Sequence, residues 1–443
     1  MKKSISILLA AMILIGACVF HAAAAKEQSS PDDAADHPDL LAGDADRDGD
    51  VTIMDATKIQ RTIAELDEMD EMSQQVAKNE FSAEELTILD ATNIQRWLAE
   101  LFSASTYEVK RSAFVWKNGE YIPITEVYKS TFDAMMKTKE FYGVMYVTRN
   151  GRVLYSGAYD EGLGYSIDTK FPVGSMSKQF CAAAIMLLVQ DGKLSVDDTL
   201  DTFFPEYSYG SQITVRNLLN MRAGITDYFN NATPKEDYDV SEDYPAEQNK
   251  KSIKEWLFEQ ELLDEPDDHF RYSNSNYFLL SLIVEQVSGE DYKGFLRKRI
   301  FAPLKMENTG FYEDMTDDPG LAKMRVSILP IETEVKGITQ GAGDLVSCAK
   351  DMDKWLTSFH TRKLLSEKSI REISTPVGGY GFGWNTDKKG ILQHDGEISD
   401  YLAKDYTDPS VNFNIFAATS ILDYRKSESG ITSIVASAAA TMK

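Results

Sequence analysis

The most informative stretch of the chain is residues 171–189, which read Phe171-Pro-Val-Gly-Ser-Met-Ser-Lys-Gln-Phe-Cys-Ala-Ala-Ala-Ile-Met-Leu-Leu-Val189. After Ser177 its side chains are apolar nearly all round, a pattern that predicts a central buried helix. Ser175 and Lys178 lie three residues apart at the start of this helix. That spacing places both side chains on one helix face, within contact range.

Ser175 and Lys178 are candidates for nucleophilic catalysis. A serine hydroxyl is a weak nucleophile at its free pKa and needs a neighbouring base, which a neutral lysine can provide. The N-terminus of the helix adds positive potential for an oxyanion. Ser177 is a second candidate nucleophile by residue type, but its spacing to Lys178 disfavours it. The S-x-x-K pattern alone is weak evidence, because such pairs are frequent by chance.

Two later fragments of the sequence strengthen the hypothesis that Ser175 and Lys178 belong to an active site. The first contains Tyr272 and Asn274, two residues apart in a polar stretch, so both polar tips can be aimed at one point. The second is Gln393-His394-Asp395-Gly396, which follows a strand-like run. A glycine in that position lets a substrate approach a strand edge closely.

Both strands and helices are predicted in the segments around the central helix. The turn Asn150-Gly151 between the runs 142–149 and 151–158 predicts a β-hairpin. Helices are predicted at 127–137, at 278–287 with Gly289 as the stop, and at 431–442. Alternating residues at 411–415 predict a further strand.

Together, the three fragments resemble the S-x-x-K, Y-x-N and third-strand (K-T-G or H-x-G) motifs of the penicillin-recognising serine hydrolases. The resemblance is closest to the class C β-lactamase and esterase branch, and it extends through most of residues 124–443. It implies an α+β fold of the β-lactamase/DD-peptidase type: an antiparallel sheet with flanking helices, plus a helical lobe. The active site would lie between sheet and lobe. Connecting segments fit the same family, namely residues 218–227, 301–304, 341–345 and 380–384.

The resemblance also implies residue roles on the catalytic side. Ser175 would be the acylated nucleophile, Lys178 its base or the partner of that base, and Tyr272 the second proton-transfer group. Asn274 would hold the acyl-side amide or ester of the substrate. Acylation of the serine would be followed by hydrolysis.

The third motif departs from the family pattern. His394 would replace the lysine of the third motif, and the oxyanion hole would be the backbone N–H groups of Ser175 and of Glu397, the residue after Gly396. Glu397 and Asp395 make this segment more acidic than is usual in the family. A substrate that carries a carboxylate prefers a positive site, so both acids disfavour such a substrate.

A duplicated unit precedes this domain. Residues 55–66 and 90–101 repeat with eight of eleven residues identical after each aspartate, at a constant offset of 35. Repetition at a fixed period indicates a duplicated structural unit. The first repeat has oxygen-bearing residues at the spacing of a twelve-residue calcium loop, with Gly49 at the sharp turn. The candidate metal ligands are Asp44, Asp46, Asp48, Asp50, Thr52 and Asp55.

The duplicated unit resembles type I-like dockerin modules of the cellulosomes of fibre-degrading anaerobic bacteria. The resemblance implies a small all-α module over residues 40–101, a structural Ca²⁺ ion, and a cohesin module of a scaffold protein as partner. Ile53 and Met54 would lie near the cohesin-facing surface. The second repeat is degenerate, because Phe81 and Ala83 cannot ligate calcium.

The first 25 residues have the pattern of a secretory signal. Lys2 and Lys3 precede an apolar run, and alanines end at Ala25. A lipobox with lipidation of Cys18 is the alternative interpretation. No later stretch is long and apolar enough to span a bilayer. We therefore expect a secreted, extracellular protein, on a cellulosome or the cell surface.

The net charge excludes some classes of binding partner, and the cysteine count bears on disulfide formation. The 443 residues carry a formal net charge of −24, which argues against nucleic acid or an anionic membrane surface as partner. Cys181 and Cys348 are expected as buried free thiols, with a single bridge between them as the alternative. The expected organisation is 1–25 signal, 40–101 dockerin-like module, 102–123 connection and 124–443 catalytic domain.

Three functions compete at this point. The first is an esterase that acts on acylated plant polysaccharide or small esters, favoured by the dockerin-like module and the non-lysine third motif. The second is a D-alanyl-D-alanine peptidase, an amidase or a β-lactamase-like activity, favoured by the S-x-x-K and Y-x-N pair. The third is a non-catalytic binding protein, which the intact Ser175, Lys178 and Tyr272 disfavour. No cofactor is expected for catalysis.

Overall fold

The computed structural model forms two compact units, residues 1–127 and 128–443. The residues that the structure describes are 40–41, 45, 47, 53–63, 69, 74, 77, 112–117, 120–160, 162–232, 236–323, 335–420 and 424–442. The predicted signal, the lipidation site Cys18 and most of the predicted dockerin-like module lie outside the described residues.

The first unit contains helix α2 (Ile53–Ile63) and a small antiparallel sheet of order β1-β2-β3. Its strands are β1 (Leu40–Leu41), β2 (Ser112–Lys117) and β3 (Glu120–Pro123). The prediction of an all-α module over 40–101 therefore fails at its first residues, because β1 pairs with β2. The signal that was missed is Asn118-Gly119, a strong hairpin sequence between two runs rich in aromatic and β-branched residues.

The second unit is built on a six-stranded sheet of order β5-β4-β12-β11-β10-β9, in which every neighbouring pair is antiparallel. The predicted hairpin is confirmed, since Asn150 and Gly151 take φ values of 50° and 80° between its two strands. The strands are β4 (Gly143–Arg149), β5 (Arg152–Tyr159), β9 (Asn385–Thr386), β10 (Leu392–Ile398), β11 (Tyr401–Asp408) and β12 (Phe413–Ser420).

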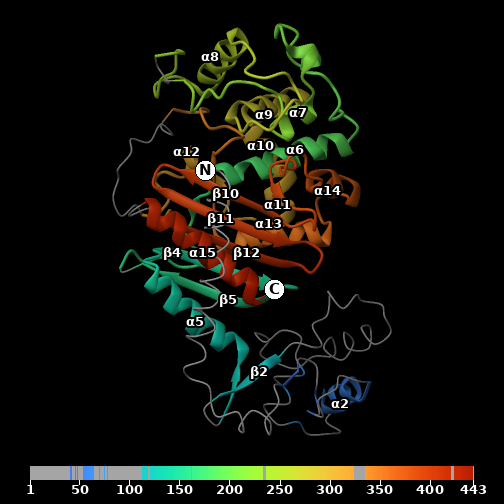
Figure 1. The fold of residues 1–443 in the computed structure, drawn as a ribbon, viewed down its shortest axis with the longest axis vertical. Coiled ribbons are helices and arrows are strands. Elements are labelled where there is room, and N and C mark those ends of the chain that lie inside the picture. Colours follow the sequence, from blue (N-terminus) through green and yellow to red (C-terminus); the bar gives the residue numbers. More distant parts are fainter. Residues whose placement is uncertain are drawn as a thin grey trace, which may run out of the picture. The chain divides into compact units, whose positions relative to one another are not determined.

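Helices cover both faces of this sheet (Figure 1). On one face, α5 (Ile124–Thr138) and α15 (Tyr424–Met442) pack against β4 and β12 in a core that includes Phe132, Val147 and Ile434. On the other face lie α6 (Ser177–Gln190) and α13 (Ala349–Thr361). The predicted α+β fold with an antiparallel sheet and flanking helices is confirmed.

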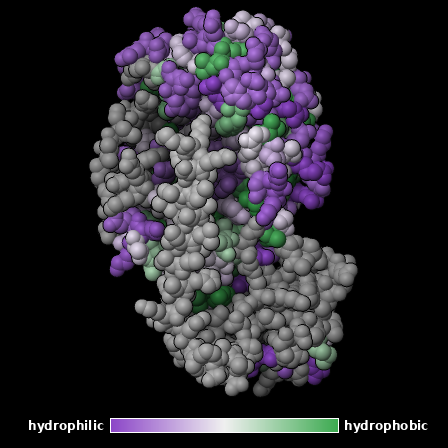
Figure 2. Space-filling view, viewed as in Figure 1, coloured by the Kyte–Doolittle hydropathy of each residue, from purple (hydrophilic) through white to green (hydrophobic). Residues whose placement is uncertain are grey.

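A helical lobe lies beyond α6, with α7, α8 and α9 grouped away from the sheet (Figure 1). Figure 2 shows a mainly hydrophilic surface over this lobe. Gly289 (φ 73°) ends α9 in the left-handed conformation, as predicted. The remaining helices are α7 (Val215–Leu219), α8 (Ala246–Glu259), α9 (Asn274–Ser288), α10 (Tyr292–Leu296), α11 (Ala302–Leu304), α12 (Tyr312–Met315) and α14 (Glu367–Ser374).

A second small sheet, of order β6-β8-β7, anchors the segment that enters α6. Its strands are β6 (Phe171–Pro172), β7 (Gly310–Phe311) and β8 (Leu345–Ser347). Within the described part of the chain, no helix has the length and apolar character needed to cross a bilayer. Cys181 and Cys348 are both buried and free.

Helix α6 is the buried central helix that its sequence predicts, with almost every side chain from Ser177 to Leu188 inaccessible. It begins two residues later than expected. Ser175 lies in the 3₁₀ turn η2 (Gly174–Met176), which leads directly into α6. The turn is tighter because Gly174 takes φ 48°, a left-handed value that a continuous helix would not allow.

Candidate active site

Ser175 and Lys178 meet as their spacing predicts. The Nζ atom of Lys178 lies 2.9 Å from Oγ of Ser175. Lys178 is fully buried, whereas Ser175 keeps part of its surface exposed. The alternative nucleophile, Ser177, is fully buried; its hydroxyl donates to the carbonyl of Gly174 and accepts from the N–H of Leu345. Ser177 therefore holds the turn, and Ser175 is the accessible hydroxyl.

Two further contacts orient the amine of Lys178. Nζ lies 2.8 Å from Oδ1 of Asn274 and 2.7 Å from the carbonyl oxygen of Ala342. Both of these oxygens can only accept hydrogen bonds. A neutral amine has two N–H donors and one lone pair. With both donors used by Asn274 and Ala342, the lone pair of a neutral Lys178 faces Oγ of Ser175, which is the geometry of a general base.

Asp227 fixes the orientation of the Asn274 amide. Nδ2 of Asn274 donates to Oδ2 of Asp227 at 3.0 Å, and the backbone N–H of Asn274 donates to the same oxygen at 3.2 Å. Because Nδ2 is held by a carboxylate, Oδ1 must point the other way, toward Lys178. The predicted substrate contact of Asn274 stays a prediction, while its contact with the lysine is observed.

Strand β10 lies directly against the nucleophile turn. A Cβ atom at Gly396 would be 1.9 Å from the carbonyl oxygen of Val173, and one at Gly174 would be 2.7 Å from the backbone nitrogen of Glu397. Both glycines are thus required for the close approach of two backbones. This contact brings the N–H-bearing backbone of residue 397 beside the turn that carries Ser175, the two segments expected to form the oxyanion hole.

Tyr272 lies at the open side of the site, with 37% of its surface exposed. Its ring centroid is 5.0 Å from Nζ of Lys178 and 6.5 Å from the ring of His394. Its hydroxyl has no hydrogen-bond partner within the part of the chain that the structure describes. The sequence therefore locates Tyr272 correctly beside the pair, and its proton-transfer role stays a prediction.

His394 is buried, with 3% of its surface exposed, and both ring nitrogens are engaged. Nδ1 lies 2.6 Å from the carbonyl oxygen of Asp395, and Nε2 lies 3.1 Å from the hydroxyl of Tyr380. Burial, followed by the nearby charge of Lys178, lowers the pKa of His394 to about 4. The imidazole is therefore neutral near pH 7, with its proton on Nδ1 and Tyr380 donating to Nε2.

A buried polar chain supports this part of β10. Asp405 on β11 accepts from the backbone N–H of His394 at 2.8 Å and from Nε2 of Gln179 at 2.7 Å. The indole N–H of Trp355 donates to the other end of the Gln179 amide at 2.8 Å. Burial raises the pKa of Asp405 to about 7. The chain links α6, α13 and the sheet at the level of the site.

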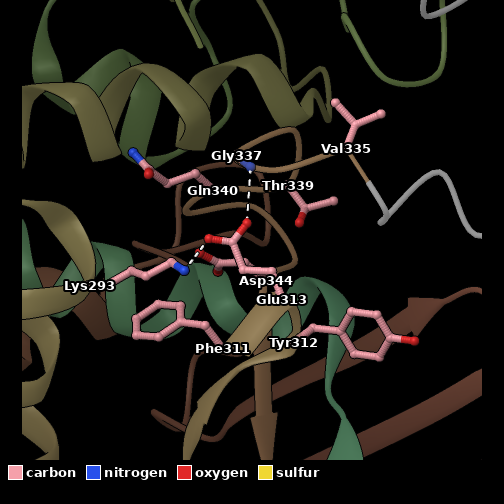
Figure 3. Close-up of a pocket in the computed structure, with 9 residues that line it drawn as sticks. All are labelled: Lys293, Phe311, Tyr312, Glu313, Val335, Gly337, Thr339, Gln340 and Asp344. Carbon is pink, nitrogen blue, oxygen red and sulfur yellow. Dashed lines mark hydrogen bonds and ion pairs between the residues drawn. The ribbon is translucent and has the colours of Figure 1, made fainter. Parts of the chain in front are cut away.

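A separate pocket lies beside the loop that carries Ala342 (Figure 3). Figure 3 shows Glu313 between Lys293, with which it forms an ion pair, and the N–H of Gly337, which donates to it. Asp344 also lines the pocket, and burial raises its pKa to about 7. None of the predicted catalytic or substrate-binding residues lines this pocket.

The predicted metal site falls mostly outside the described residues. Asp44, Asp46, Asp48, Asp50 and Thr52 are among those not described. Asp55 is fully buried, and its Oδ1 accepts from the backbone N–H of Ala45 at 2.7 Å. Within the described part of the chain, no three His, Cys, Asp or Glu side chains are grouped to hold a metal ion.

The sequence did not predict the roles of four residues of the site. Asp227 ends the segment 218–227 and Tyr380 begins the segment 380–384. Both segments fit the family resemblance, but the sequence alone assigns neither residue a role. The roles of Ala342 and Asp405 depend on contacts between distant parts of the chain. A local pattern carries no information about such contacts.

A partly exposed serine, hydrogen-bonded to a buried lysine at the start of a central helix and faced by a strand edge, defines the site of an active-serine hydrolase. The Beta-lactamase family model matches residues 129–430, and the chain belongs to this family of serine hydrolases.

Known relatives agree with this assignment. The chain is 30% identical over 265 residues to the putative penicillin-binding protein PbpX of Bacillus subtilis (strain 168), covering 56% of this chain and 63% of that protein. It is 27% identical over 303 residues to penicillin-binding protein 4* of the same organism, covering 60% of this chain and 65% of that protein. The chain thus spans less than two thirds of the length of these curated relatives.

Solved structures share the fold. The D-amino acid amidase of Ochrobactrum anthropi SV3 superposes with a TM-score of 0.58 and 22% identity, covering 70% of this chain and 99% of that chain. At this identity the similarity concerns the fold alone.

Proposed function

We propose that this protein hydrolyses peptide or amide bonds of the D-alanyl type through an acyl-enzyme on Ser175. The observation that carries the proposal is the hydrogen-bond geometry of Lys178, whose amine has two fixed acceptors and a third direction that points at Oγ of Ser175. The relatives at 27–30% identity are penicillin-binding proteins, and this supports a peptidase or amidase more than an esterase on plant polysaccharide.

The proposed reaction has two halves. Oγ of Ser175 attacks the carbonyl carbon while its proton passes to Nζ of Lys178, and the oxyanion is held by the backbone N–H groups of residues 175 and 397. The carbon–nitrogen bond then breaks, and Tyr272 passes a proton to the departing amine. In the second half, water attacks the acyl-enzyme and gives a proton to Tyr272, the acid is released, and Ser175 regains its proton from Lys178.

The exposure of Tyr272 supports its proposed role on the leaving-group side. Its ring lies within 5.0 Å of Nζ of Lys178, so one hydroxyl can serve a departing group while the lysine serves the serine. The third-motif histidine, neutral and buried, supports the ester-hydrolysing alternative, because an ester needs no cationic receptor. Both substrate classes therefore belong in the same experiment.

The test is intact-protein mass spectrometry after incubation with a fluorophosphonate probe and, separately, with penicillin. We expect both reagents to add to the wild type and neither to add to Ser175→Ala. Ser177→Ala is the matched control at the adjacent hydroxyl, and its adducts should persist wherever the variant folds. Labelling by the fluorophosphonate alone would favour the esterase, and labelling by neither would contradict an acyl-enzyme on Ser175.

We also propose that the first unit binds calcium through the loop 44–55 and docks to a cohesin outside the cell. Support comes from Asp55, a fully buried carboxylate already tied to the loop through the N–H of Ala45, and from Met54, which exposes 60% of its surface on α2. Carboxylate oxygens at this spacing suit Ca²⁺. We expect Asp44→Ala with Asp46→Ala to abolish calcium-dependent cohesin binding and to leave hydrolysis intact. Loss of hydrolysis in that variant would contradict independent units.

A further inference from the structure

Two aromatic side chains near the active site are exposed to solvent, on the segment that leads into α9. Phe270 exposes 38% of its surface and Tyr272 exposes 37%. Among the described residues of the second unit, Leu263 is the only other large apolar or aromatic side chain that is exposed, and it belongs to the same ten-residue stretch. Exposed apolar groups that gather beside a catalytic site are typical of a ligand-binding surface.

Contacts with one buried ring show that the two exposed side chains form a common surface. The ring centroid of Tyr380 is 5.5 Å from that of Phe270 and 6.4 Å from that of Tyr272. Tyr380 itself is only 1% exposed, so the two rings lie over it and face the solvent. We call the surface made by Phe270 and Tyr272 the aromatic shelf.

The aromatic shelf is continuous with the catalytic residues. The ring centroid of Tyr272 is 5.0 Å from Nζ of Lys178, and this atom is 2.9 Å from Oγ of Ser175. A substrate group next to the bond that Ser175 cleaves therefore meets Tyr272 first and Phe270 beyond it. Because the proposed reaction places Tyr272 at the departing amine, the shelf belongs to the leaving-group side of the substrate.

The segment that carries the aromatic shelf is fixed by its own contacts. The backbone N–H groups of Asp267 and Arg271 donate to the carbonyl oxygens of Arg222 and Met221, each at 2.8 Å. Ion pairs join Arg222 to Asp267 and Arg271 to Asp264. Rings on a backbone that is already ordered lose little conformational freedom when a ligand covers them. The shelf is thus preorganised for binding.

We propose that the aromatic shelf is a subsite for the leaving group, and that it selects a leaving group with an aromatic or large apolar side chain. The inference rests on the proposed function and specifies its substrate class: D-alanyl peptides in which the residue after the cleaved bond is bulky rather than alanine. A ring that covers the shelf removes apolar surface from water, and offset or edge-to-face contacts between rings add to this gain. Phe270 is the specificity-determining residue, since Tyr272 has a separate role in proton transfer.

The test compares N-acetyl-D-alanyl-D-phenylalanine with N-acetyl-D-alanyl-D-alanine, both blocked as carboxamides, so that the cleaved bond is the same. We expect kcat/KM of the wild type to favour the D-phenylalanyl peptide by about tenfold, mainly through a lower KM. Phe270→Ala should bring this ratio close to one, and Phe270→Leu, which keeps apolar volume, should give an intermediate ratio. Leu263→Ala removes another exposed apolar side chain of the same segment and is the matched control; it should leave the ratio unchanged.

A structural role of Phe270 predicts a different result. If the ring only shields Tyr380, Phe270→Ala and Phe270→Leu will slow the hydrolysis of both peptides by the same factor, and the ratio will stay at its wild-type value. That outcome would overturn the inference, as would a wild-type ratio of one.

Binding to Ser175→Ala, measured by calorimetry, separates the inference from the proposed function. Tighter binding of the D-phenylalanyl peptide, lost when Phe270→Ala is added, supports the aromatic shelf even if neither peptide is hydrolysed. Equal binding of the two peptides, or binding of neither, would contradict it. Fluorophosphonate labelling of Ser175 in the wild type decides the acyl-enzyme independently of both peptides.

Discussion

The carboxylate of Asp227 accepts a hydrogen bond from the side-chain amide of Asn274, with 3.0 Å between Oδ2 and Nδ2. Through this bond Asp227 acts on the lysine, because it decides which end of the amide faces Nζ of Lys178. Removal of the carboxylate leaves the amide free to rotate and to offer its N–H₂ group to the amine. Asp227 is a positioning residue, because its carboxylate acts on Lys178 through Asn274 and forms no hydrogen bond with Ser175 among the described residues.

We therefore expect Asp227→Ala to lower kcat by about 100-fold, because misplacement of a reacting group has costs of this order. The KM should change much less than kcat. Asp227→Asn is the conservative control; it retains an acceptor oxygen and should recover part of the activity. Steady-state kinetics on an activated ester separate the two parameters, and an unchanged kcat in Asp227→Ala would refute the positioning role.

A second prediction concerns the hydroxyl of Tyr380. It donates to the neutral form of His394 and so helps to keep the pKa of the imidazole low. Tyr380→Phe removes this bond, and the pKa of His394 should rise from about 4 toward its ordinary value. The measurement is an NMR titration of the imidazole proton and carbon resonances. A pKa that stays the same, or falls, would show that Tyr380 does not fix the tautomer.

The contact between Gly396 and Val173 gives a third prediction. A methyl group at residue 396 would overlap the carbonyl oxygen at 1.9 Å, so β10 must move away from the turn. Gly396→Ala should lose most labelling by an active-serine probe, and a cost of about 1–3 kcal/mol in stability is typical of overpacking. The control is Gly343→Ala, whose added carbon would meet only ordinary contacts at 3.7 Å or more. Equal labelling of both variants would contradict a shape requirement at 396.

Asp344 gives a prediction about pH. Burial raises its pKa to about 7 in the folded protein, from an ordinary value of 3.8. The stability that this carboxyl contributes when protonated is present below pH 4 and is lost as the pH rises through about 7. One of its oxygens, Oδ1, is buried and has no hydrogen-bond partner among the described residues, and Oδ2 accepts from the N–H of Gly341.

Asp344→Asn keeps that acceptor and removes the charge. We expect the variant to be more stable than the wild type at pH 8, by roughly 2 kcal/mol, and about equally stable at pH 4. The full pKa shift would correspond to a larger difference in the free energy of unfolding, but the Asp344 side chain is partly exposed, and solvent screens its charge. Chemical unfolding at the two pH values measures the difference. A stability gain of equal size at both would rule out the ionisation as its cause.

The second unit was predictable because its motifs encode local geometry. Ser175 and Lys178 share a helical face by spacing alone, and Asn150-Gly151 specifies its hairpin through left-handed backbone preferences. The predicted catalytic and third-motif residues come together around one serine as expected. Their partners Asp227 and Asp405 were not predictable, because each reaches the site through tertiary contacts between segments that no periodicity links.

The start of α6 shows a second feature that the sequence alone does not predict. A 3₁₀ turn and a helical turn place residues three apart at similar distances, so the S-x-x-K spacing fits both. The turn is selected by the crowding of β10 against Gly174, which is a property of the folded chain. In the first unit, the hairpin of β2 and β3 was predictable from the sequence, because Asn118-Gly119 lies between the two strands.

The contact of Gly396 with Val173 also determines when the protein can become active. The two halves of the predicted oxyanion hole come from opposite ends of the second unit, and β10 is completed only near the end of the chain. During synthesis, Ser175 and Lys178 emerge long before residue 397 can stand beside them. A nascent or C-terminally truncated chain would carry the nucleophile without its oxyanion hole. Hydrolytic activity therefore requires that the whole second unit has been synthesised and folded.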